Sequence, residues 1–228
     1  MVAIDFQTFA LKVVPSPATN DHEVRLLGDG EELIDRFWDG MIGLDPNDIL
    51  LEPCPIKPSA AGRKATVARC DCGVIGCGSV EVIVRSDGDK VLWVEGDRML
   101  RFPAAAYEAE INRAQRDTSW ETLERTAARL VREQVDRDLL ARNGLSFEWA
   151  SGRASNGRFT VSLRLDPGPH QVLVSVPWSS ETAEDLANSA LELLKGDPRT
   201  WDGVGYLPQR GDLGNPPLIG PGWKRGAG

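Results

Sequence analysis

Apolar and polar residues alternate with a period of two along several short stretches of the chain, which is the spacing of a strand with one buried face. The alternation is clearest in residues 80–85, 158–165 and 172–176. A turn-forming Ser-Asp-Gly-Asp at residues 86–89 joins the first of these to a return strand over residues 91–94. Because such connections are too short for crossovers, we expect antiparallel hairpins. Further strands are expected over residues 22–27, 64–70 and 145–149.

Helices are predicted where apolar residues recur three and four positions apart. Asp29 and Glu32 match a capping box, and the apolar spacing that follows predicts a helix over residues 33–41. Another helix is expected over residues 104–116, because Pro103 suits the first turn of a helix.

Two more helices are expected in the second half of the chain. Thr118 opens a second capping box, ahead of a long helix that ends near residue 143. That helix would include the Asp-Arg-Asp at residues 136–138, which reads as surface charge. Ser180 is expected to cap the last helix, which Gly196 would end.

The order of these elements is β-α-β-β-β, then α-α, then β-β-β-α, which predicts an α+β fold. We expect antiparallel sheets of hairpins with helices packed on one side. Residues 1–205 are predicted to form a single domain, with room for a subdivision near residue 100. Residues 206–228 are rich in glycine and proline, so an irregular tail is expected there. Trp201 and Trp223 are expected to pin this C-terminal region to the body.

The charge of the chain is negative and unevenly placed. The 228 residues carry a net charge of −8, and residues 1–60 hold 11 acids against 4 Lys/Arg, a net of −7. An acidic surface repels phosphate backbones, so a nucleic-acid partner is not expected, whereas a basic protein partner would suit it. No apolar run is long enough to cross a membrane, and residues 1–14 lack the pattern of a signal peptide. We therefore expect a cytoplasmic protein.

Three of the four cysteines lie within eight residues, in the sequence Cys70-Asp-Cys72-Gly-Val-Ile-Gly-Cys77-Gly. The glycines allow a tight turn that brings the three sulfur atoms towards one point. A structural zinc ion takes four tetrahedral ligands, so Cys70, Cys72 and Cys77 would supply three of them. Cys54, 16 residues upstream, is the candidate for the fourth. Because a single residue separates Cys70 from Cys72, the loop has to bend before both can reach one metal.

Two other interpretations of these cysteines stay open. The thiols would be small buried apolar groups in a glycine turn if they were inert. Alternatively, Cys72 and Cys77 would form a disulfide or a redox couple, or one of the cysteines would act as a nucleophile. A nucleophilic cysteine needs a base, and the two histidines of the chain, His22 and His170, are distant in sequence.

The run from Ala68 to Phe102, with its Cys-x-Cys-Gly-x-x-Gly-Cys-Gly core, resembles an uncharacterised bacterial protein family, mostly from high-GC genomes. The run Ser119-Trp-Glu-Thr122 adds to the resemblance, which extends over most of residues 22–205. The resemblance implies a bacterial cytosolic origin and carries no known activity.

Two hypotheses about function follow. The first is a non-catalytic protein-interaction or accessory protein, such as an immunity protein, in which the cysteine loop is structural. The acidic residues 1–60 and the lack of a complete catalytic motif in the sequence favour it. The second is an enzyme that uses a thiolate or a thiolate-bound zinc ion, which the carboxylate of Asp71 beside the cysteines favours.

Overall fold

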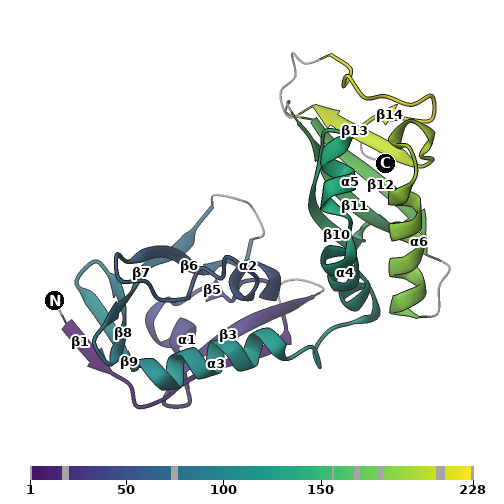
Figure 1. Cartoon of the computed structure of the whole chain (residues 1–228). Helices are drawn as coiled ribbons and strands as arrows, with labels where there is room; N and C mark the ends of the chain where they lie inside the picture. Colours follow the sequence, from purple (N-terminus) through teal and green to yellow (C-terminus); the bar gives the residue numbers. More distant parts are fainter. Residues whose placement is uncertain are drawn as a thin grey trace. The chain divides into compact units, whose positions relative to one another are not determined.

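The chain folds into two compact units, Met1–Trp120 and Glu121–Gly228, which are drawn in Figure 1. A computed structural model describes residues 2–16, 21–72, 77–155, 157–166, 170–178, 182–208 and 214–226. Each unit has its own cluster of buried apolar residues. Most strands pair as antiparallel hairpins and helices pack against the sheets, which confirms the predicted α+β class.

The first unit contains a six-stranded sheet in the order β1-β9-β8-β7-β6-β5. Strand β1 runs parallel to β9, and the other neighbours are antiparallel. The strands of this sheet are β1 (Val2–Asp5), β5 (Met41–Ile42), β6 (Arg63–Cys70), β7 (Ser79–Asp87), β8 (Lys90–Glu95) and β9 (Arg98–Pro103). The predicted hairpin over residues 80–94 is therefore confirmed.

Among its described residues, this unit also has a smaller antiparallel sheet and three helices. The sheet has the order β2-β3-β4, with β2 (Phe9–Pro15), β3 (His22–Gly28) and β4 (Glu31–Glu32). The helices are α1 (Leu33–Phe37), α2 (Pro46–Leu50) and α3 (Ala104–Arg116). Strand β3 and helix α3 lie where the sequence predicted them.

The capping box predicted at Asp29 is wrong. Asp29 and Gly30 both have positive φ and form the two-residue turn between β3 and β4, as Asp-Gly pairs do in hairpins. The Asp29 carboxylate accepts hydrogen bonds from the backbone N–H groups of Gln7 (2.8 Å) and Thr8 (2.7 Å). It therefore ties this turn to the residues just before β2 and caps no helix.

The helix predicted over residues 33–41 is also too long. Helix α1 ends at Phe37, and Met41 belongs to β5, where it is paired with Cys70 of β6. The spacing of Met41 from the apolar residues before it suits a helix. Pairing with a neighbouring strand satisfies the backbone groups of this segment instead. This difference places Met41 beside the cysteine loop.

Five aromatic side chains form the centre of the core of the first unit: Phe6, Phe9, Trp93, Phe102 and Tyr107. The Phe9 and Tyr107 rings are stacked with centroids 4.3 Å apart. The Trp93 indole N–H donates to the Tyr107 hydroxyl (2.9 Å), which donates to the Ile56 carbonyl (2.8 Å). All the polar atoms of this chain of hydrogen bonds are thus satisfied inside an apolar core.

Replacing Tyr107 with phenylalanine should lower the free energy of unfolding by about 1–3 kcal/mol. The ring would stay packed, but the Trp93 N–H and the Ile56 carbonyl would lose their shared partner while staying buried. Urea denaturation of the full chain, wild type against Tyr107→Phe, measures this difference. Equal stabilities would show that the hydroxyl contributes nothing.

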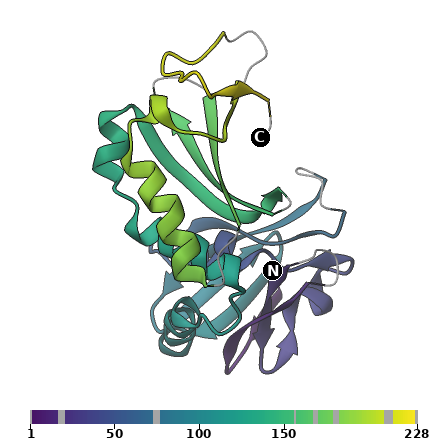
Figure 2. The same cartoon turned by 90° about the vertical axis from the view of Figure 1, so that its right-hand side faces the viewer.

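The second unit has one five-stranded sheet in the order β10-β11-β12-β13-β14. Figure 2 shows α6 lying along this sheet, and α4 packs against both α6 and β10. The strands are β10 (Leu145–Ser155), β11 (Arg158–Leu165), β12 (His170–Pro177), β13 (Val204–Pro208) and β14 (Lys224–Arg225). The helices are α4 (Leu123–Gln134), α5 (Arg137–Arg142), α6 (Ala183–Lys195) and the 3-10 helix η1 (Pro198–Thr200).

The single long helix predicted after Thr118 is in fact two helices. Asp136 interrupts it, because its side chain accepts from the Leu139 N–H (2.8 Å) and so caps α5. The predicted capping box is not formed: helix α4 begins after Thr122, and Glu121 accepts from Arg129 (3.0 Å) instead.

The last helix and the C-terminal region follow the prediction in part. Thr182 is the N-cap of α6, accepting from the Asp185 N–H at 3.1 Å, while the predicted cap, Ser180, lies outside the described residues. Gly196 ends the helix as predicted. The C-terminal region is largely irregular but adds β13 and β14 to the sheet. Trp201 and Trp223 are both buried, which confirms that they pin it to the body.

Candidate metal centre

The three clustered cysteines lie where β6 passes into β7. Cys70 is the last residue of β6, and Cys72 and Cys77 lie in the loop that follows. The Cys70 N–H donates to the Gly78 carbonyl at 3.0 Å, which holds the two ends of the loop together. Asp71 and Cys72 form a turn, and this is the bend that two cysteines separated by one residue need. Residues 73–76 lie outside the described residues.

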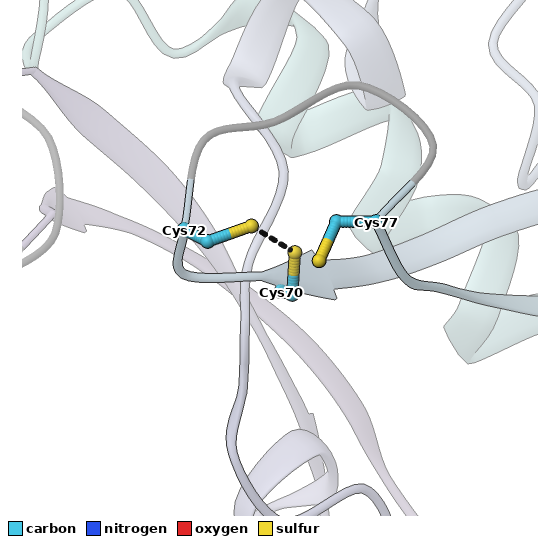
Figure 3. Close-up of side chains that lie close together, drawn as sticks. All are labelled: Cys70, Cys72 and Cys77. Atoms are coloured by element: carbon cyan, nitrogen blue, oxygen red, sulfur yellow. Dashed lines mark hydrogen bonds between the residues drawn. The ribbon is translucent and has the colours of Figure 1, made fainter.

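The structure brings the three thiols to one point. Their Sγ atoms all lie within 4.8 Å of one another, and the Sγ atoms of Cys70 and Cys72 are 2.8 Å apart. Figure 3 shows the three side chains converging from different parts of the loop. In a tetrahedral zinc site with Zn–S bonds of about 2.3 Å, sulfur atoms are about 3.8 Å apart. A shift of about 1 Å would therefore adapt this cluster to a metal ion of that size.

Two of the three thiols are open to solvent, and the neighbouring sulfur atoms favour the protonated form of Cys77. Cys70 is half-buried, and Cys72 and Cys77 are exposed. Hydrogen bonds with Cys72 and then with Cys70, together with the repulsion between neighbouring thiolates, raise the pKa of Cys77 to about 11. A bound cation would reverse this effect, because its positive charge stabilises adjacent thiolates.

Cys54 is not part of this cluster. It is fully buried in the core of the first unit, and its thiol donates to the Ile49 carbonyl (3.3 Å). Burial raises the pKa of this thiol, as expected for a small apolar group in a core. The structure thus assembles three of the four proposed ligands and leaves the fourth elsewhere.

The two histidines also have other partners. His22 Nδ1 lies 3.2 Å from a carboxylate oxygen of Asp21, and its ring lies beside Trp120 with centroids 5.6 Å apart. His170 is buried in the second unit, with Nε2 2.9 Å from the Gly214 carbonyl. Neither is placed among the clustered thiols as a base or a ligand.

A sulfur atom that the sequence prediction did not include lies next to the cluster. Met41, expected on a helix, is the partner of Cys70 in the pairing of β5 with β6. Its side chain is partly buried against the core of the first unit. The feature of the sequence that could have identified Met41 as a candidate ligand is its residue type, because a thioether is a donor for soft metal ions.

Comparison with known protein families, with curated proteins and with solved structures gave no significant match. The resemblance of Ala68–Phe102 to a bacterial family therefore stays a prediction, while the cysteine cluster at its centre is present in the structure. Of the helices in the described ranges, none combines the length and the apolar composition that crossing a bilayer requires.

Proposed function

We propose that this chain is a metal-binding accessory protein of the bacterial cytoplasm, in which Cys70, Cys72 and Cys77 together hold one thiophilic ion. The observation that carries the proposal is the approach of three Sγ atoms to within 4.8 Å at the surface. Zinc suits such a set, because thiolates are its usual structural ligands. The ion would bind both ends of the loop between β6 and β7 and fix its shape.

The role proposed for the fixed loop is recognition of another protein, as in an immunity or accessory protein. Strands β6 and β7, which the loop connects, are paired with each other and with their neighbours in the sheet, so the two ends of the loop have a firm base. The net charge of −7 on residues 1–60 of the same unit supports a basic partner.

A second candidate is an enzyme that uses thiolate-bound zinc. The exposure of Cys72 and Cys77 favours it, since three protein ligands with a solvent-accessible fourth position are typical of catalytic zinc. The two candidates differ in one respect that can be measured: a catalytic ion keeps an exchangeable water, and a structural ion has four protein ligands.

Metal content and thiol reactivity test the shared part of the proposal. We expect about one zinc ion per wild-type chain, with three thiols protected from a thiol reagent. Cys72→Ser and Cys77→Ser should each lose the metal on desalting, because two thiolates do not retain it. Cys54→Ala is the matched control and should keep it, since Cys54 lies outside the cluster.

The proposal fails if the reduced wild-type protein binds no stoichiometric zinc, cadmium or Cu(I). It also fails if Cys72→Ser and Cys77→Ser retain the ion as firmly as the wild type does. Circular dichroism of each variant shows whether the fold is intact, so that a loss of metal is not mistaken for unfolding.

A further inference from the structure

We infer that the thioether of Met41 is the fourth donor of the Cys70, Cys72 and Cys77 site, and that it gives the site a preference for Cu(I) over Zn(II). This inference rests on the proposed function, because it needs the cysteine cluster to bind a metal. It adds which donor completes the site and which class of metal ion the complete site selects.

The first step is the alignment of three residues on three adjacent strands. Met41 of β5 is the partner of Cys70 of β6. On the other side of β6, the Cys70 N–H donates to the carbonyl of Gly78, just ahead of β7. Residues directly opposite one another in antiparallel strands project to the same face of a sheet. Met41, Cys70 and position 78 therefore share a face.

The second step is the direction of the Met41 side chain. A side-chain carbon at Gly78 would lie 3.7 Å from the Met41 terminal methyl, and 3.8 Å from Cys70 Cβ. Adjacent strands are about 4.8 Å apart, so the backbones of Met41 and Gly78 are separated by about 10 Å. Cys70 lies between these two residues, so a Met41 methyl group that reaches Gly78 must extend across the face of β6 above Cys70. The sulfur of Met41, one bond before that methyl, therefore lies over Cys70.

The third step is the chemistry of the four sulfur atoms. Thiolates serve both zinc and Cu(I), but a thioether is a ligand for soft ions and is absent from the usual ligand set of zinc. Met41 carries no charge and no ionisable proton, and its partly buried position keeps water from one side of the site. Binding of Cu(I) breaks three S–H bonds and releases three protons to the buffer. Four Cu–S contacts form, and no electron is transferred.

The test compares Met41→Leu with wild type and with Met99→Leu, using the full chain under anaerobic, reducing conditions. Leucine nearly conserves the volume of methionine, and Met99 of β9 is a methionine of the same sheet that is separated from β6 by two strands. Affinities for Cu(I) are measured by competition with a chromogenic chelator, and affinities for Zn(II) in parallel. We expect Met41→Leu to lower the Cu(I) affinity by about 10-fold or more and to leave the Zn(II) affinity unchanged. Met99→Leu should change neither.

X-ray absorption at the selenium edge is a second measurement, and it looks for the copper contact in the wild-type chain itself. In protein labelled with selenomethionine and loaded with Cu(I), a copper neighbour should be seen around selenium, and it should disappear in Met41→Leu.

An unchanged Cu(I) affinity in Met41→Leu, or no copper neighbour at selenium, overturns this inference alone. An equal loss of Cu(I) and Zn(II) affinity also overturns it, since that is the effect of a purely structural residue. If the wild type binds neither ion, the proposed function falls with it.

Discussion

Replacing Trp93 with alanine should lower the free energy of unfolding by about 3–5 kcal/mol, the range for removing a large aromatic side chain from a packed core. Trp93 is 1% exposed, and its ring contacts those of Phe9, Phe102 and Tyr107. Alanine would leave a cavity between these rings and would also remove the donor to the Tyr107 hydroxyl. The change in the midpoint of urea denaturation of the full chain, followed by circular dichroism, measures the effect.

Two control variants interpret this loss of stability. One shows how much of it comes from the packed ring and how much from the indole hydrogen bond, and the other shows whether replacing any tryptophan would destabilise the protein as much. Trp93→Phe keeps an aromatic ring in place and should lose clearly less stability than Trp93→Ala. Trp149→Ala removes a tryptophan that is 38% exposed, so a loss below about 1 kcal/mol is expected. If Trp93→Ala were no more harmful than Trp149→Ala, the aromatic cluster would not be the centre of the core.

The strands were the most predictable part of this fold. Residues 80–85 and 158–165 alternate between apolar and polar side chains, and they form β7 and β11 with the expected antiparallel neighbours. In β7 the reason is physical: Val80, Val82 and Val84 are buried while the residues between them are exposed, so a one-residue slip would turn the apolar face to water. In β11 the polar residues Thr160 and Ser162 are buried as well. Short-range information is sufficient in these segments.

Helix ends were less predictable, because one short pattern suits two structures. Asp29-Gly30 reads as a helix cap or as a hairpin turn, and the backbone N–H groups of Gln7 and Thr8, more than 20 residues away, decide between them. Asp136 gives the opposite case: it looked like one of the surface charges of a long helix, yet it caps a new one. The deciding contact is distant in sequence for Asp29 and local for Asp136, and the residue type alone distinguishes neither pair of alternatives.

The candidate metal centre likewise has one part that the local sequence predicts and another part that depends on strand pairing. Cys70, Cys72 and Cys77 could be predicted to meet, because nine residues with three glycines can close on themselves. The fourth donor that we infer, Met41, could not be predicted, because it depends on which strand pairs with β6. The position of β5 brings Met41 there, and the burial of Cys54 in the core keeps that thiol away.

The apparent affinity of the cluster for zinc should rise by about 1,000-fold between pH 6 and pH 7. A cysteine thiol is ordinarily protonated in this range, and the neighbouring sulfurs raise the pKa of Cys77 further, to about 11. The metal binds thiolates, so each of the three ligands must release its proton on binding. Raising the pH favours proton release, and each proton contributes a factor of about ten per pH unit.

The number of protons released also identifies the ligand set, which makes this pH titration a test of the fourth position. Three protons fit Cys70, Cys72 and Cys77 with an uncharged fourth ligand, and Cys54→Ala should then give the same slope as wild type. Four protons in the wild type and three in Cys54→Ala would instead make Cys54 a ligand, which would require its thiol to leave the Ile49 carbonyl and the core. A zinc affinity independent of pH would exclude thiolate coordination altogether. Competition titrations against a chelator of known pH dependence, at several pH values between 6 and 7, distinguish these three results.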